Sequence, residues 1–527
     1  MFTAGTVNAI SASSDIIACE QAGYNCYRPV SFGRSILALG FDKAILWCEY
    51  KRPNLAKGRS PEMFDIQARH STVGREVLGG VTTFMAMSYI IFVQPALLSK
   101  TGMDSGGVFM ATCISAGVAC VLMGLLANYP IALAPGMGEN FFFVYTLCAV
   151  GSTAGPGVFK LTWQEALALT VVTGLLFLIL SLAGFRSRLL NAIPDSLKSG
   201  IAAGIGLFIA LIGFEWGNLI KAHPVTYVQL AGMRGNYVAV LTLIGLAATL
   251  ALVAWRVRGA ILIGILVTTA ATWAAGPILG LETITRPEKV SLVSGLCSTA
   301  GQFAGGFAML GDKLLSDQWV HVVTFAFILL FMDLFDTVGT LVGVASRANL
   351  IHNGKLDRAE RALSADAAGT VIGACLGTST VTSYIESITG VQSGARTGLA
   401  AVVAGGCMLL AILAWPVVQV VGGGVSIGID AFGDPILRYP MIASALIVVG
   451  ALMVRAIRDV KWQDMTESLP AFLTMVTMPF AYSISAGIAI GFVSYAVGKI
   501  LTGRIRECPV IVYVFAALFV VQYAVAM

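Results

Sequence analysis

The chain carries a succession of apolar runs, each long enough to cross a lipid bilayer, and this feature limits its fold more than any other. The runs are continuous rather than alternating, so they predict membrane-spanning helices and exclude a closed β-barrel. The 527 residues are 57% hydrophobic and 12% charged, whereas soluble domains carry about 25% charged residues. We therefore expect an all-α polytopic membrane protein.

Two of the apolar segments cannot be regular helices. In residues 128–140, Pro135 and Gly136 follow an earlier proline and precede another glycine, and such residues break a helix. Residues 378–392 begin with a stretch rich in Ser, Thr and β-branched residues. Extended backbone at membrane depth survives only where protein or a wet cavity covers it. We expect each break to be a short extended strand that leads into a half-helix, the first beginning near Asn140.

The breaks recur at corresponding positions, because each half of the chain has seven segments and the third in each half is broken. Such pairing indicates a transporter built from inverted repeats, with its site between the broken segments. The predicted fold has fourteen transmembrane segments in two inverted seven-segment repeats, segments 3 and 10 being broken. The expected segments are residues 76–98, 107–127, 128–147, 164–184, 196–213, 236–255, 259–279, 319–345, 363–377, 378–392, 396–421, 440–456, 468–482 and 484–500, with a polar loop before the eighth.

Lys and Arg are more frequent in the loops on one side of these segments, which predicts a cytoplasmic N-terminus. The expected location is the plasma membrane, in bacteria the inner membrane. Residues 1–61 hold no spanning run and no signal-peptide pattern, and we expect a disordered extension. The last apolar run, residues 509–526, fits a helix that lies along the membrane or one that crosses it.

The eighth segment carries two carboxylates, Asp333 and Asp336, near its middle. Three residues apart on a helix, they share roughly one face. A charge at membrane depth is costly, so it must face a cavity, a partner or a substrate. A structural pair bonded to neighbouring helix ends is the alternative, but two acids on one face favour function.

Topology brings four polar groups together near the midplane: Asn140, Glu386, Asp333 and Asp336. Carboxylates accept hydrogen bonds from ring N–H or amino groups when ionised and donate when protonated. A carboxyl group that binds and releases a proton can couple protons to substrate movement. Glu386 and Asp333 are the candidates for this coupling, and the spacing does not choose between them.

Three further residues have both a functional and a structural interpretation. Phe141 fits stacking on a flat ring or plain packing, Thr337 fits a ligand contact or a bond to its own helix, and Glu139 fits a ligand group or a helix cap. The ten Cys form no CxxC pair and there are only four His, so we expect no metal site and no cofactor. The net charge of +5 resides in loops and does not predict nucleic-acid binding.

Long motifs in a fixed order give the chain a family resemblance. They are residues 84–95 (FMAMSYIIFVQP), 127–140 (ANYPIALAPGMGEN), 331–340 (FMDLFDTVGT), 377–387 (GTSTVTSYIES) and 394–398 (GARTG). Over about residues 62–500 the chain resembles the AzgA-like branch of the nucleobase–ascorbate transporter superfamily, the hypoxanthine/adenine/guanine permeases. This resemblance implies proton-coupled purine uptake by an elevator-type movement within membrane lipid.

The resemblance also implies site residues. In the family pattern Asn140, Asp333 and Glu386 are purine ligands, and Asp336 supports the site. Two positions depart from the pattern, because Gln94 replaces the usual Asn and Glu139 an apolar residue. Glu139 adjoins Asn140, which the pattern gives as a purine-binding residue, so the pattern does not determine which purine is preferred.

The implied domain organisation is a core that moves against a gate, in a homodimer. The core is formed by residues 62–185 and 301–425, the gate by residues 186–300 and 426–507, and residues 508–527 form a C-terminal apolar helix.

Three alternatives remain from the sequence. A carrier of another flat heterocycle, such as uracil or xanthine, fits the same fold. An anion carrier is disfavoured, because it needs a basic group between the half-helices. A membrane-embedded hydrolase would use Asp333 and Asp336 as a catalytic pair and would leave the two broken segments unexplained.

Overall fold

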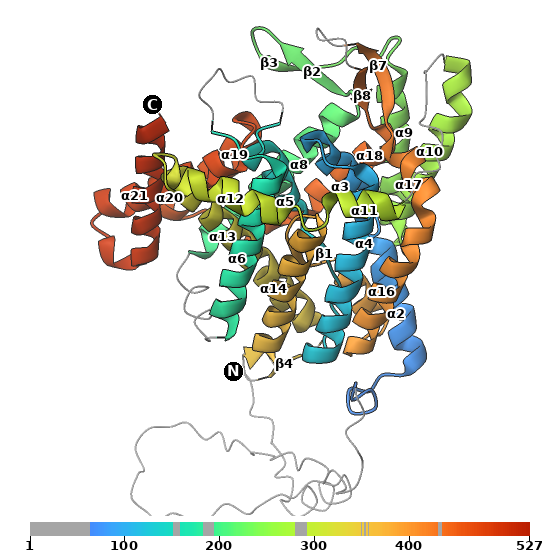
Figure 1. The fold of residues 1–527 in the computed structure, drawn as a ribbon, viewed down its shortest axis with the longest axis horizontal. Coiled ribbons are helices and arrows are strands. Elements are labelled where there is room, and N and C mark those ends of the chain that lie inside the picture. The colour runs from blue at the N-terminus through green and yellow to red at the C-terminus, as the bar shows by residue number, and fades with distance from the viewer. Residues whose placement is uncertain are drawn as a thin grey trace, which may run out of the picture. The chain divides into compact units, whose positions relative to one another are not determined.

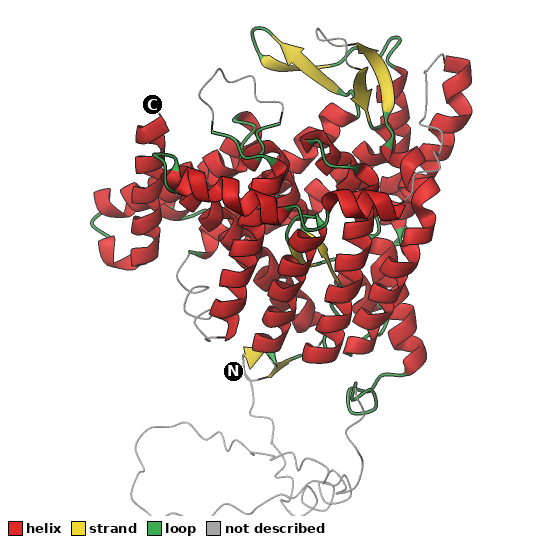
Figure 2. Cartoon of the chain, viewed as in Figure 1, coloured by secondary structure: helices red, strands yellow, loops and turns green. Residues whose placement is uncertain are grey.

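The computed structural model describes residues 64–150, 159–182, 194–279, 292–348, 350–352, 355–356, 358–429 and 435–526. The expected disordered extension, residues 1–61, lies outside the described residues. The described part is mostly helical, with four two-stranded antiparallel sheets (Figure 2). Within these ranges, nine helices are long and apolar enough to cross a membrane.

The first seven segments follow the predicted order. They are α2 (Val73–Met87) with α3 (Ile90–Leu98), α4 (Ser105–Leu122), the broken segment β1 (Leu133–Pro135) with α5 (Met137–Phe141) and the π-helical residues Phe142–Leu147, α6 (Trp163–Leu182), α8 (Asp195–Trp216), α9 (Tyr237–Ala254) and α10 (Ala260–Leu279). A hairpin of β2 (Ile220–His223) and β3 (Tyr227–Leu230) joins α8 to α9.

The second seven segments repeat this arrangement. They are α13 (Trp319–Arg347), α14 (Ala359–Leu376), the broken segment β6 (Val381–Ser383) with α15 (Ser387–Gln392), α16 (Gly398–Leu410) with α17 (Trp415–Gly422), α18 (Pro440–Met453), α19 (Met465–Phe480) and α20 (Ile484–Leu501). Two hairpins connect segments, β4 (Ile351–His352) with β5 (Lys355–Leu356), and β7 (Val425–Ile429) with β8 (Pro435–Arg438). In Figure 1 the β2–β3 and β7–β8 hairpins lie at the same end of the helices.

The helices pack in two groups. Helix α14 contacts α4 and α6, and α16 contacts α2 and α4, and these helices run side by side in Figure 1. Helix α8 packs against α18 and α19, and α9 packs against α10 and α18. Each group therefore draws helices from both halves of the chain. Apolar side chains that no neighbour covers, such as Leu175 and Ile179 on α6, suit contact with lipid.

The structure differs from the predicted elements in three places. The expected polar loop before the eighth segment contains two helices, α11 (Leu292–Thr299) and α12 (Phe303–Leu314), which pack on α4 and α6. The first half-helix begins at Met137 rather than near Asn140, because Gly136 already supplies the extended N-cap backbone. The first segment is interrupted at Ser88 and Tyr89, between α2 and α3.

The last apolar run forms helix α21 (Val510–Ala526), which packs on α20 and α13. The Phe515 ring centroid lies 3.5 Å from that of Phe327 and 5.2 Å from that of Phe331, both on α13. On α20, Phe492 lies 5.7 Å from Phe515. An aromatic cluster therefore holds α21 against two segments that are distant in sequence.

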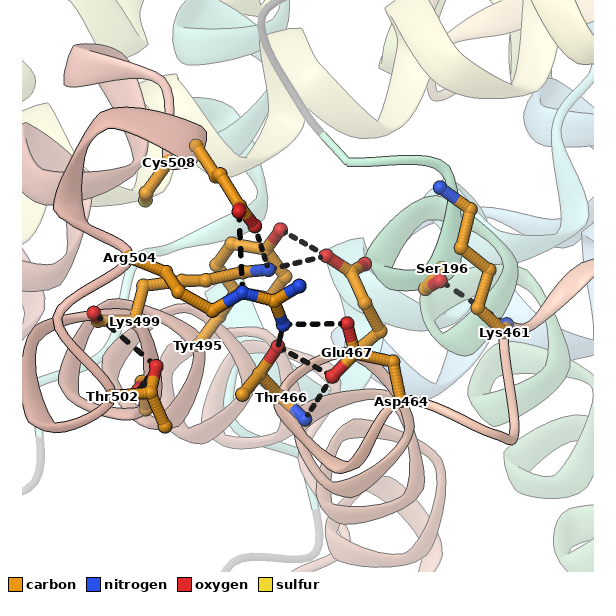
Figure 3. Close-up of polar contacts among 12 residues, drawn as sticks. Ser196, Lys461, Asp464, Thr466, Glu467, Tyr495, Lys499, Thr502, Arg504 and Cys508 are labelled. Carbon is orange, nitrogen blue, oxygen red and sulfur yellow. Dashed lines mark hydrogen bonds and ion pairs between the residues drawn. The ribbon is translucent and has the colours of Figure 1, made fainter.

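Charged residues fix the turn that leads into α21 (Figure 3). Lys499 of α20 is 2% exposed, and its Nζ lies 2.9 Å from Glu467 Oε1 of α19 and 3.3 Å from Glu507 Oε2. Arg504 Nη1 lies 2.8 Å from Asp464 Oδ2, and its Nε lies 3.2 Å from Glu507 Oε1. This network joins α19, α20 and the α21 turn.

We expect Lys499→Met to lower the free energy of unfolding by about 3 kcal/mol, because it leaves Glu467 without its buried cation. Unfolding of the purified protein in detergent measures the change. Lys198→Met is the matched control: it breaks the exposed pair with Asp195 and should cost less than about 1 kcal/mol. If the two variants lose equal free energy of unfolding, burial of the Lys499 network contributes nothing to stability.

The pKa of Asp464 is lowered from 3.8 to about 2, first by hydrogen bonds from Thr466 and then by Arg504. A carboxyl group with a lowered folded-state pKa stabilises the fold above its unfolded pKa, and this contribution is lost as the pH falls through the folded value. We expect the melting-temperature difference between the parent and Asp464→Asn to shrink between pH 3.8 and about pH 2. A difference that stays constant across this window would contradict the assignment.

Candidate functional site

The two broken segments meet as an antiparallel strand pair. Leu133 pairs with Ser383, and Pro135 pairs with Val381. The hydrogen bonds continue beyond both ends of the pair. Gly136 N donates to Thr380 O at 2.9 Å, and Tyr384 N donates to Ala132 O at 2.9 Å. Because the strands are antiparallel, α5 and α15 begin at opposite ends of the pair, roughly 10 Å apart. The extended backbone at membrane depth is thus hydrogen-bonded, as the sequence required.

Asn140 lies in the first turns of α5 and is fully buried. Its Oδ1 accepts a short hydrogen bond from the Ser379 hydroxyl, and its Nδ2 lies 3.5 Å from Pro135 O. Gln94 Nε2 donates to Ser379 Oγ at 2.9 Å and to Thr378 Oγ1 at 3.0 Å. Helix α3 therefore positions Asn140 through hydroxyl groups of the second broken segment.

Helix α13 brings its two carboxylates to the same strand pair. Thr382 Oγ1 donates to Asp336 Oδ2 at 3.2 Å. Thr370 Oγ1 lies 3.4 Å from Asp333 Oδ2 and 2.9 Å from the Val381 carbonyl. Asp333 is buried and Asp336 is half-buried. The structure thus places both acids of the eighth segment beside β6, as topology predicted.

Glu386 immediately precedes α15 and is half-buried. Tyr89, at the interruption between α2 and α3, donates its hydroxyl to Glu386 Oε1 at 2.8 Å. Tyr384 donates to Pro135 O at 2.5 Å, and its ring centroid lies 6.4 Å from that of Tyr89. Two tyrosines therefore flank Glu386, and one of them orients its carboxylate.

The remaining candidates surround this centre. Phe141 is buried, with its ring centroid 6.0 Å from Tyr145 and 6.2 Å from Phe208 of α8. Thr337 donates to Asp366 Oδ2 at 2.6 Å rather than to its own helix backbone. Glu139 is buried beside Asn140.

The arrangement is acidic and rich in hydroxyl groups. Within the described ranges, Lys499 is the one Lys or Arg that is buried, and it belongs to the network near α21. Such a site offers acceptors and an amide to a ligand with N–H groups, and it does not suit an anion.

Sequence reasoning missed five residues of this centre: Tyr89, Thr370, Ser379, Thr382 and Tyr384. The Ser and Thr content of residues 378–383 was the available signal for Ser379 and Thr382, and it was interpreted only as a preference for extended backbone. Nothing in the local sequence distinguishes Tyr89, because its partner lies almost three hundred positions away.

We expect Asp366→Ala to lower the free energy of unfolding by about 3 kcal/mol. Asp366 accepts hydrogen bonds from Thr337 at 2.6 Å and Ser383 at 2.8 Å, so the change leaves two buried hydroxyls without an acceptor. Asp366→Asn retains one acceptor oxygen, so its free energy of unfolding should fall by less. Detergent unfolding of both variants is the measurement, and parent-like stability of Asp366→Ala would refute this bridging role.

The chain resembles known permeases over most of its length. A model of the Permease family matches residues 74–490. A guanine/hypoxanthine permease of Bacillus subtilis is 40% identical over 457 residues, covering 85% of this chain and 96% of the relative. An adenine permease of Escherichia coli is 38% identical over 468 residues, covering 88% of this chain and 96% of the relative.

Solved structures share the architecture at low sequence identity. The transmembrane domain of a cyanobacterial bicarbonate transporter has a TM-score of 0.54 at 15% identity, covering 79% of this chain and 96% of that chain. The murine anion transporter of solute carrier family 26, in its inward-facing state, has a TM-score of 0.53 at 11% identity, covering 86% of this chain and 74% of that chain. The predicted inverted-repeat fold and the predicted family resemblance are confirmed. The chain belongs to the Permease family and is a multi-pass membrane transporter rather than an enzyme.

Proposed function

We propose that this chain imports the purine nucleobases hypoxanthine, guanine and adenine across the plasma membrane by proton symport. The observation that carries the proposal is the meeting of Asn140, Asp336 and Glu386 around the β1–β6 pair. The names of the Bacillus subtilis and Escherichia coli relatives, a guanine/hypoxanthine permease and an adenine permease, support the purine class.

In this proposal Asn140, Asp333 and Glu386 bind the purine ring, and Asp336 supports the site. Purines present ring N–H groups, ring nitrogens and, in guanine and adenine, an amino group along their edges. Carboxylates accept from the N–H and amino groups, whereas the amide of Asn140 both donates and accepts. The acidic character of the site therefore suits the N–H and amino groups of a purine.

Three neighbours complete the proposed binding site. Phe141 stacks on the purine, and the rings of Tyr145 and Phe208 support it from behind. Thr337 acts through Asp366, which also binds Ser383 of β6. Glu139 borders Asn140 as an additional polar group of the site.

Proton coupling is assigned to Glu386 and Asp333. Glu386 is half-buried and receives a hydrogen bond from Tyr89 at 2.8 Å, so its carboxylate has a defined position from which to gain and lose a proton. Symport follows if purine binding and proton binding favour each other at this position.

The proposed movement is of elevator type. The core comprises residues 62–185 and 301–425, and the gate comprises residues 186–300 and 426–507. The two packing groups of helices support this division. A crevice between α13 of the core and α8 and α20 of the gate is lined by apolar side chains such as Met332, Ile201 and Ile488, a surface suited to sliding.

The proposed setting is the bacterial inner membrane, with the N-terminus in the cytoplasm. The excess of Lys and Arg in alternate loops supports this orientation. A homodimer is proposed as the working unit, with the gate domains as its stationary centre.

The test is uptake of labelled hypoxanthine, adenine and guanine by cells that lack their own purine carriers, with and without a protonophore. We expect saturable uptake that the protonophore abolishes, and a loss of at least about tenfold in Glu386→Gln, because a hydrogen bond to a charged group is removed. Glu360→Gln changes an exposed glutamate at the start of α14 and should behave as the parent does.

Protein at the cell surface is quantified for every variant. Surface-expressed parent protein that takes up none of the three purines would refute the purine assignment, and uptake of uracil or xanthine instead would identify the alternative substrate. Purine uptake that resists the protonophore would refute proton symport but would leave the purine assignment standing.

A further inference from the structure

Glu139 is a buried carboxylate whose hydrogen bonding is incomplete. It lies in the first turn of α5 and is 1% exposed. Its Oε2 has no hydrogen-bond partner among the residues that the structure describes. A buried polar atom without a partner is uncommon and calls for a group that completes it.

The neighbours of Glu139 lead to Asp336. Its Oε2 and the Thr382 hydroxyl both lie within 3.0 Å of the point that a Cβ atom on Gly136 would occupy. The Thr382 hydroxyl in turn donates to Asp336 Oδ2 at 3.2 Å. Gly136 therefore packs against both Glu139 and Thr382, and a side chain at position 136 would displace them.

Among the described residues, the ionisable groups that interact with Glu139 are all acidic. It interacts electrostatically with Asp336 of α13 and Asp366 of α14, and with the Tyr384 hydroxyl that follows β6. Asp333 lies on the same helix as Asp336, and Glu386 and Tyr89 also interact electrostatically with Asp336. Lys499, the one buried Lys or Arg in the described ranges, belongs to the network at the end of α20. Two neighbouring carboxylates, one buried and one half-buried, favour binding a proton between them, because their negative charges repel each other.

We propose that Glu139, Thr382 and Asp336 form a second proton-binding site of this transporter, beside the nucleobase site. The inference rests on the proposed function, since it assumes that transport is coupled to protons. One proton binds to the Glu139–Asp336 pair when the site faces outward and leaves when it faces inward, with no other bond made or broken. Together with the proton assigned to Glu386 and Asp333, each nucleobase then enters with two protons.

Purified full-length protein in liposomes tests the number of protons. With the membrane potential clamped at zero, a pH difference of one unit drives accumulation by about tenfold for each coupled proton. We expect about 100-fold accumulation of labelled hypoxanthine by the parent, and about tenfold by Glu139→Gln, which keeps the size and polarity of the side chain but cannot titrate. Glu139→Leu should match Glu139→Gln, and Glu360→Gln should match the parent.

Exchange of labelled for unlabelled hypoxanthine, at equal pH on both sides, separates this inference from the proposed function. Parent protein that does not exchange hypoxanthine would refute the purine assignment itself. Parent protein that exchanges but accumulates only about tenfold would overturn the second proton site without any variant being needed. Equal accumulation by the parent and Glu139→Gln would also overturn it and leave Glu139 as a cap of α5 or a plain ligand.

Discussion

The pairing of β1 with β6 is the constraint on which the rest of this structure depends. Extended backbone in the middle of a membrane protein must find internal partners for its N–H and C=O groups. Here each broken segment supplies the partner of the other, and side chains complete the set: Tyr384 donates to Pro135 O, and Ser387 Oγ accepts from Ala132 N. The two halves of the chain are therefore joined at the point where the half-helices begin.

This junction also explains the many hydroxyl groups of the second break. They serve the backbone and the acids together, since Thr382 binds Asp336, Ser383 binds Asp366, and Ser379 binds Asn140. Neutral donors hold the carboxylates in place without neutralising them, as an arginine would. In the proposed function, this arrangement leaves the acids able to bind a proton or an N–H group of a substrate, a capacity that a buried ion pair would reduce.

Helix α13 links this polar centre to the packing of the protein. Its carboxylates face β6, whereas Phe327, Phe331 and Phe335 recur every four residues on the opposite face. The first two contact Phe515 of α21, and the charged network around Lys499 fixes the turn before α21. A movement of α13 relative to α20 must therefore repack these rings, so α21 belongs to the interface across which the proposed elevator moves.

The sequence by itself determined the membrane class, the order of the fourteen segments and the position of both breaks, because length, hydropathy and helix-breaking residues are local properties. It also singled out Asn140, Asp333, Asp336 and Glu386 as candidate site residues, since a polar group inside an apolar segment is conspicuous without any structure. It did not predict α11 and α12, whose short apolar faces are stabilised only by packing on α4 and α6.

Only the tertiary structure decided which groups meet. The contacts of Tyr89 with Glu386 and of Gln94 with Ser379 join residues almost three hundred positions apart, and no local pattern encodes such a distance. The same holds for the last apolar run, whose hydropathy fits either a surface or a spanning helix. The structure decided its neighbours, since the aromatic rings of α13 and α20 pack against it, and such packing between distant segments is not encoded in composition.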